Sequence, residues 1–146
     1  MKTILFDLDG TLADITHRRH YVMSEKKNWA QFNAHIGDDK PNLPIVSLYK
    51  TLWQSQQYEI IIVSGRSEQY RKITEHWLIW HEIPFKRLVM RQIKDNRKDA
   101  IIKKEILDLL RQEGKDILFA VDDRQQVVDM WRENGIMCLQ CDIGDF

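Results

Sequence analysis

The sequence predicts an α/β protein in which helices cover both faces of a mostly parallel β-sheet, giving three layers. Strand-like and helix-like segments alternate along the chain. The strand-like segments are continuously apolar, which is typical of strands buried on both faces. A length of 146 residues and a hydrophobic content of 43% suffice for a sizeable core. We therefore expect a single domain over residues 1–146.

The first half of the chain contains two predicted strands. The first is Ile4–Phe6, a short apolar run close to the N-terminus. Residues 12–40 are mixed and polar, with short helical stretches expected among them. A helix should begin near Pro44, because proline suits the first turn of a helix and apolar residues follow it at helical spacing. The second strand is Tyr58–Val63, which is expected to be fully buried.

The second half continues the alternation of helices and strands. A helix over about residues 68–81 follows the second strand, with Ser67 as its N-cap. The apolar residues Ile73, Trp77 and Trp80 are expected to face inward from this helix. The later elements are expected, in order, at Arg87–Met90, a long helix ending at Gly114, Ile117–Val121, a helix ending near Asn134, and Ile136–Leu139.

Composition excludes several classes of protein. Lysine and arginine number 22, as do aspartate and glutamate, so a generally basic nucleic-acid-binding protein is not indicated. No apolar run approaches the roughly 18–20 residues of a membrane span, and no signal peptide is evident. A cytoplasmic protein with no membrane partner is expected. Cys138 and Cys141 supply two of the roughly four ligands of a structural zinc site, so ordinary reduced cysteines are predicted.

Polar and acidic residues follow three of the predicted strands. Asp7 and Asp9 follow the first strand, Ser64 the second, and Asp122 and Asp123 the fourth. In a parallel sheet these strand ends meet at one edge, which is where ligands bind. Four carboxylates at one edge repel one another unless a cation or a proton is present.

The chemistry of this set points to phosphoryl transfer with Mg²⁺ as the cofactor. Mg²⁺ prefers carboxylate oxygens together with a substrate phosphate, so all four aspartates are candidate ligands. Asp123 could instead lie one shell away from the metal. The Ser64 hydroxyl can bind a phosphate oxygen, and a helical lysine can balance the remaining charge. A carboxylate would then be the nucleophile.

These residues resemble the haloacid dehalogenase-like superfamily. The motif DLDGT at Asp7–Thr11, Ser64, a helical lysine and the pair Asp122-Asp123 occur in the family's order. The resemblance implies a Rossmann-like fold, with Asp7 as the nucleophile of an aspartyl-phosphate intermediate. It also implies that Asp9 protonates the leaving oxygen and then deprotonates water. The second aspartate points to a phosphatase, because members that cleave carbon–halogen bonds lack it.

The C-terminal half resembles, more narrowly, the 3′-phosphatase domains of bacteriophage polynucleotide kinase-phosphatases. The shared segments are SGR after the second strand, RKD before the helical lysine, and DDRQQVVDMWR. Lys103 is then the catalytic lysine; Lys98 and Lys104 are rivals, but Lys103 shares a helix face with Asp99. The residues to which this resemblance assigns substrate contacts are Thr11, Arg18, Ser64, Gly65, Arg66 and Asp99.

The predicted function is removal of a 3′-phosphate from DNA or RNA ends. The segment between Leu12 and Leu43 is too short for a large lid, so only a minimal cap is expected. A separate kinase or ligase is a possible partner, since the glycines form no G-x-x-x-x-G-K-[ST] motif. A nucleotide or small-metabolite phosphatase is one alternative. A non-catalytic module that binds phosphorylated ends is another. The match to a terminal GDF carries no assigned role.

Overall fold

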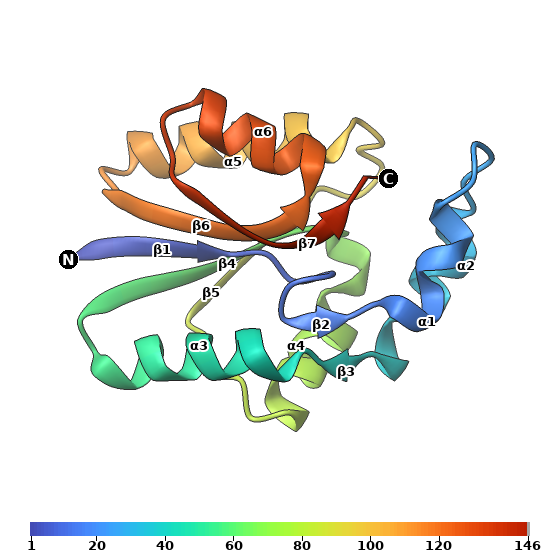
Figure 1. The fold of residues 1–146 in the computed structure, drawn as a ribbon, viewed down its shortest axis with the longest axis horizontal. Coiled ribbons are helices and arrows are strands. Elements are labelled where there is room, and N and C mark those ends of the chain that lie inside the picture. Colours follow the sequence, from blue (N-terminus) through green and yellow to red (C-terminus); the bar gives the residue numbers. More distant parts are fainter. Residues whose placement is uncertain (146) are drawn as a thin grey trace.

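The protein forms a three-layer α/β fold around one parallel sheet, as predicted (Figure 1). The computed structural model describes residues 1–145. Five strands pair in the order β5-β4-β1-β6-β7, and every pair is parallel. The strands are β1 (Lys2–Phe6), β4 (Tyr58–Ser67), β5 (Arg87–Arg91), β6 (Ile117–Arg124) and β7 (Cys138–Gly144).

Four longer helices cover the two faces of the sheet (Figure 1). One face carries α3 (Leu43–Ser55) and α4 (Arg71–Trp80). The other carries α5 (Asp99–Gln112) and α6 (Gln125–Glu133). This arrangement explains why the strands are continuously apolar, since side chains on both faces of each strand are buried.

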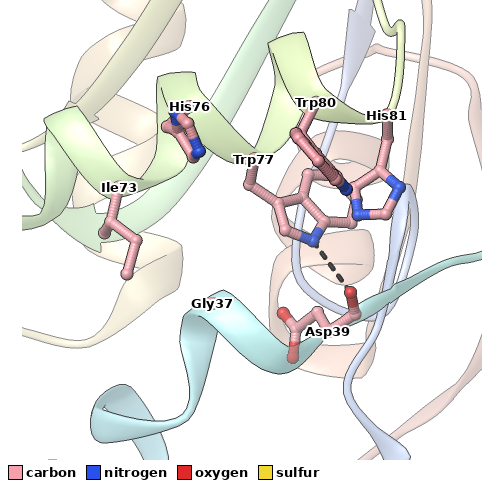
Figure 2. A pocket seen from close by; sticks show the side chains of 7 residues that line it. All are labelled: Gly37, Asp39, Ile73, His76, Trp77, Trp80 and His81. Atoms are coloured by element: carbon pink, nitrogen blue, oxygen red, sulfur yellow. Dashed lines mark hydrogen bonds between the residues drawn. The ribbon is translucent and has the colours of Figure 1, made fainter.

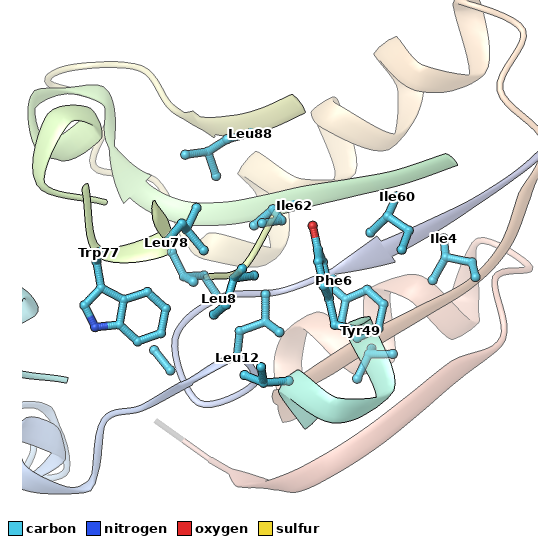
Figure 3. Packing of buried hydrophobic residues seen from close by; sticks show 14 of the residues in the cluster. Ile4, Phe6, Leu8, Leu12, Tyr49, Ile60, Ile62, Trp77, Leu78 and Leu88 are labelled. Carbon is cyan, nitrogen blue, oxygen red and sulfur yellow. The ribbon is translucent and has the colours of Figure 1, made fainter. Parts of the chain in front are cut away.

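The core divides into two clusters because successive strand residues point to opposite faces. Ile4 and Phe6 pack with Ile62 and Tyr49 on the α3/α4 side (Figure 3). Leu5, between the first two, packs with residues of α5 and α6 on the other side. The central strand β1 is therefore fixed from both faces, and with it the position of the residues that follow it.

The polar segment predicted to be a minimal cap folds into short elements beyond the carboxyl ends of β1 and β6 (Figure 1). A two-stranded antiparallel ribbon forms its base. A small cluster of Ile15, Val22 and Phe32 forms its interior. The cap elements are β2 (Ala13–Asp14), α1 (Thr16–Arg19), a 3₁₀ turn at His20–Val22, α2 (Trp29–Ala34), a 3₁₀ turn at Ile36–Asp38 and β3 (Lys40–Pro41).

Two strands run further than the apolar pattern indicated. β4 continues through the SGR segment to Ser67, and β6 continues to Arg124. Neighbouring strands pair with these extensions, for example Ser64 with Met90. The last strand also lies later than predicted, at Cys138–Gly144, because its polar residues pair with the extension of β6. The polar residues at the strand ends are thus held by the sheet itself.

The inward face of α4 differs from the prediction. Trp80 is 74% exposed and Ile73 is also exposed, so the prediction for these two residues is wrong. Thr74, Trp77 and Leu78 form the buried face instead. The buried face includes Thr74 because its hydroxyl accepts a hydrogen bond of 3.0 Å from Arg66 Nη1. The predicted N-cap is confirmed, since Ser67 Oγ accepts from the Gln69 amide at the preceding 3₁₀ turn.

Two further expectations concern membrane-spanning helices and the two cysteines. Across residues 1–145, none of the helices has the length and apolar character that crossing a bilayer requires. Cys138 and Cys141 are both free. Burial raises the pKa of each thiol to about 12, so little reactive thiolate exists near neutral pH.

The two tryptophans of α4 provide a test of this packing. Replacing Trp77 by alanine should lower the free energy of unfolding by about 3–5 kcal/mol, because a large buried side chain is lost. The matched change Trp80→Ala should cost less than about 0.5 kcal/mol, because that side chain is mostly in solvent. Urea denaturation followed by circular dichroism measures both. Equal losses would contradict the orientation of α4.

Candidate active site

Three aspartates form an acidic cluster at the carboxyl ends of β1 and β6. The amide of Asp7 donates to Val121 O at 3.0 Å, which continues the pairing of the two strands and aligns their ends. Each of Asp7, Asp122 and Asp123 offers a carboxylate oxygen, and these oxygens lie within 4.8 Å of one another. All three side chains are buried, so solvent screens their mutual repulsion weakly.

Lys103 supplies the positive charge within this cluster. Its Nζ lies 2.7 Å from Asp7 Oδ1, 3.1 Å from Asp122 Oδ2 and 3.6 Å from Asp99 Oδ2. The residue is only 1% exposed. Burial alone lowers the pKa of the ammonium, but the three carboxylates outweigh this effect and raise it, so Lys103 stays charged. Its rival Lys104 instead binds Asp108 at the surface.

The acidic cluster retains unsatisfied negative charge despite Lys103. Burial and the neighbouring aspartates raise the pKa of Asp7. The same causes raise the pKa of Asp123 to about 7. Within residues 1–145, the buried Asp123 Oδ2 has no hydrogen-bond partner, and Arg19 Nη2 lies 3.5 Å from it. An orphaned carboxylate oxygen among three acidic side chains fits a hard divalent cation such as Mg²⁺.

Asp9 lies in a different environment from the other motif aspartate. Arg66 Nη2 and Arg18 Nη2 each approach Asp9 Oδ1 to 2.6 Å. Burial acts to raise the pKa of Asp9, but the two guanidinium groups outweigh it and hold the pKa well below its usual range. The Asp9 carboxylate is not part of the acidic cluster found among residues 1–145. Its side chain is therefore paired with the two arginines, and its predicted role as a metal ligand stays a prediction.

Asp39 joins these arginines and is a residue that the sequence analysis missed. Its carboxylate accepts from Arg18 Nε and Nη2, both at 2.7 Å, and from Arg66 Nη2 at 3.2 Å. Arg18 is fully buried by this contact. Asp39 sits in the polar cap segment, with no motif or strand end to mark it. The sequence carried no local signal for it, because its partners are distant along the chain.

A cavity of about 430 Å³ lies beside Asp39, between α4 and the 3₁₀ turn at Ile36–Asp38 (Figure 2). Its wall includes Trp77, whose Nε1 donates to the main-chain oxygen of Asp39 at 2.8 Å (Figure 2). This bond anchors Asp39 to α4. Helix α4 thus supports Asp39, the cap residue that binds both arginines. The cavity itself contains none of the cluster aspartates.

The last part of β4 and the start of α5 bring Ser64, Gly65 and Asp99 together. Ser64 Oγ accepts from the Arg66 amide at 3.1 Å. A Cβ atom on Gly65 would lie 2.1 Å from Asp99 Oδ1, so this position has no room for a side chain. Asp99 in turn lies 3.6 Å from Arg91 Nη2 and from Arg124 Nη1. The sequence analysis also missed these two arginines, although each ends a strand, which was a usable signal.

The glycines and the threonine of the site have definite packing roles. Thr11 Oγ1 donates to Asp7 Oδ2 at 3.0 Å and orients that carboxylate. Gly10 has a φ of +81°, and a Cβ there would lie 2.0 Å from Asp123 Oδ2. Gly144, of the terminal GDF, packs against the backbone of Asp123 and Arg124, where a Cβ would be 3.0 Å away. Phe146 lies outside the described residues.

The fold and the site together define a class of protein. The site combines one aspartate directly after the central strand, a second aspartate two residues later, a buried lysine and a further pair of aspartates. This combination is typical of haloacid dehalogenase-like phosphatases. The chain belongs to the family described as "Polynucleotide kinase PNKP phosphatase domain", whose model matches residues 1–146. The family resemblance seen in the sequence is thereby confirmed.

Several known proteins are similar to this chain. A chain of the Pnkp1/Rnl/Hen1 RNA repair complex is 39% identical with a TM-score of 0.83, covering 99% of this chain and 43% of that one. A protein of Autographa californica nuclear polyhedrosis virus, whose assigned name is a bifunctional polynucleotide kinase/RNA ligase, is 28% identical over 133 residues. That match covers 90% of this chain and 18% of the viral protein. This chain therefore spans less than half of either relative.

More distant structures share the fold alone. A haloacid dehalogenase-like family protein of Streptococcus pneumoniae is 17% identical, with a TM-score of 0.65, covering 96% of this chain and 84% of that one. An enzyme of the same superfamily from Bacteroides thetaiotaomicron, solved with magnesium and inorganic phosphate, is 13% identical with a TM-score of 0.61. It covers 100% of this chain and 96% of the neighbour.

The buried contacts of Asp39 predict a large effect of its removal. Asp39→Asn should lower the free energy of unfolding by about 3–5 kcal/mol, because Arg18 and Arg66 lose a buried countercharge. Asp38→Asn is the matched control, since its carboxylate is exposed, and it should change stability by less than about 0.5 kcal/mol. Urea denaturation measures both free energies. Similar values for the two variants would contradict the role of Asp39.

Proposed function

We propose that this chain is a Mg²⁺-dependent phosphatase that removes the 3′-phosphate from polynucleotide ends through an aspartyl-phosphate intermediate on Asp7. The observation that carries the proposal is the family match over residues 1–146. The intact pair Asp7 and Asp9 and the charged, buried Lys103 support it. A module that only bound phosphate would have no need of this arrangement.

Asp7 is the proposed nucleophile. One of its carboxylate oxygens forms a bond to phosphorus while the bond between phosphorus and the 3′ oxygen breaks. Thr11 and Lys103 each bind one Asp7 oxygen, which fixes the direction of attack. Asp7, Asp122 and Asp123 would hold Mg²⁺, which would supply charge stabilisation for the phosphoryl group. Ser64 and the backbone after it are the proposed ligands of the remaining phosphate oxygens.

Asp9 is the proposed general acid and base. It gives a proton to the departing 3′ oxygen and later takes one from the water that hydrolyses the acyl phosphate, which releases inorganic phosphate and restores Asp7. Arg18 and Arg66 hold the pKa of Asp9 low in the structure without substrate. A phosphate dianion near these arginines would offset their charge and raise that pKa toward the range needed for protonation.

RNA ends are the proposed substrate, and the cytoplasm the proposed location. The structural relative at 39% identity belongs to an RNA repair complex that also contains Rnl and Hen1. The name of the viral relative describes both a polynucleotide kinase and an RNA ligase. A kinase and a ligase, on separate chains or on the same longer chain, are therefore the proposed partners, since removal of a 3′-phosphate produces the 3′-hydroxyl that ligation requires.

The substrate assignment is tested by comparing phosphorylated ends. A 3′-phosphorylated RNA oligonucleotide should be hydrolysed with a far higher kcat/KM than the same oligonucleotide phosphorylated at the 5′ end or than a 3′-mononucleotide. Phosphate release with Mg²⁺, and its loss in excess EDTA, are the measurements. Equal turnover of the mononucleotide would favour a metabolite phosphatase. Binding of the 3′-phosphorylated end without turnover would favour the non-catalytic module.

The role of Asp9 is tested by the leaving group. Asp9→Asn should lower turnover of an alkyl phosphate by about 10²–10⁴-fold, because an alkoxide leaves poorly without a proton. It should lower turnover of p-nitrophenyl phosphate much less, because the phenolate leaves readily. Asp7→Asn is the comparison variant and should abolish both reactions, since the nucleophile itself is lost. Equal losses on both substrates in Asp9→Asn would contradict the assignment.

A further inference from the structure

Trp29 is a large apolar residue that the fold leaves in solvent. It is the first residue of α2 in the cap and is 41% exposed. The interior of the cap consists of Ile15, Val22 and Phe32, with Tyr21 packed against them, and does not include Trp29. Part of this ring is therefore open to contact with a ligand.

Trp29 adjoins the candidate active site on two sides. The guanidinium of Arg124 lies over its ring, 5.5 Å from the centroid. Arg124 is itself 3.6 Å from Asp99, which contacts the catalytic Lys103. Trp29 also packs edge-to-face with Phe32, and the two ring centroids are 5.4 Å apart.

Phe32 continues this second connection to the proposed acid. The guanidinium of Arg18 lies 4.2 Å from the Phe32 ring centroid. Arg18 in turn binds Asp9 at 2.6 Å. Trp29 is thus linked through one neighbour to the lysine side of the site and through another to the Asp9 side. Helix α2, which begins with Trp29, lies beyond the carboxyl ends of the strands (Figure 1).

The surroundings of Trp29 match those of an aromatic platform for a nucleobase. Proteins that bind single-stranded nucleic acid combine an exposed aromatic ring with nearby positive charge. Lys27 is exposed, and its Nζ lies 6.0 Å from the Trp29 centroid, so it adds a mobile charge near the ring. Arg124 adds a fixed charge beside the site.

We propose that Trp29 stacks on the base of the nucleotide that carries the 3′-phosphate and so selects polynucleotide ends over smaller phosphate esters. The inference rests on the proposed function and adds a residue that positions its substrate. The terminal phosphate enters the site at Asp7, and the attached nucleoside extends outward beneath the cap. Because every base has a π face, the contact should favour a base without selecting which base is present.

The test measures the value of the terminal base with and without the aromatic ring. Two 3′-phosphorylated oligonucleotides are compared, one complete and one whose last sugar is a stable analogue without a base. For the wild type, kcat/KM should be higher for the complete end by about 5- to 100-fold, the range expected for one base stacked on an aromatic ring. In Trp29→Leu this ratio should fall close to one, because leucine fills space but offers no π face.

Two further variants separate stacking from loss of structure. Trp29→Phe should retain most of the ratio, because phenylalanine still stacks. Trp80→Ala removes an exposed tryptophan of α4 that lies outside the site, and it should keep the full wild-type ratio. A preserved ratio in Trp29→Leu, or a ratio near one in the wild type, would overturn the inference.

The proposed function can fail independently of this inference. If the wild type hydrolyses p-nitrophenyl phosphate but neither oligonucleotide, then the polynucleotide assignment is wrong and the role of Trp29 is overturned with it. If the wild type hydrolyses both oligonucleotides equally well, the 3′-phosphatase assignment stands and only the stacking role of Trp29 is lost.

Discussion

The charged amine of Lys103, buried among Asp7, Asp99 and Asp122, is the interaction on which the site depends. Burial and the neighbouring aspartates raise the pKa of Asp7, and the ammonium of Lys103 acts against this rise. The sheet provides the rigidity that such an arrangement needs, because Asp7 follows β1 and Asp122 belongs to β6, while α5 supplies Lys103 and Asp99. The orphaned oxygen of Asp123 within the acidic cluster fits a divalent cation.

A second buried ion network joins the cap to the sheet. Arg18 and Asp39 come from the cap, Arg66 from β4, and Asp9 from the turn after β1. Removing a single member leaves buried charge without compensation, which is costly. The position of the proposed general acid is therefore inseparable from the docking of the cap.

Sequence reasoning reached those parts of the site that local pattern encodes. Apolar runs ending in Asp7, Ser64 and Asp122 implied a shared edge, because parallel topology alone brings strand ends together. The spacing from Asp99 to Lys103 separated the lysine from its neighbours. Asp39 could not be found this way, since its importance arises from partners brought near by folding. The inward face of α4 was misjudged for a related reason. It includes Thr74, which accepts a hydrogen bond from Arg66, and a pattern of apolar residues cannot predict a polar contact of this kind.

The two ends of the chain leave the sheet on opposite sides. Lys2 pairs with Tyr58 at the amino ends of the strands, whereas Gly144 pairs with Arg124 beside the acidic cluster (Figure 1). A domain joined before residue 1 would lie at the amino ends of the strands and leave the approach to Asp7 clear. A domain joined at the other end would emerge next to the entrance and pass alongside any bound nucleic acid. The end at which such a domain is joined thus decides whether it lies far from the acidic cluster or borders the approach to it.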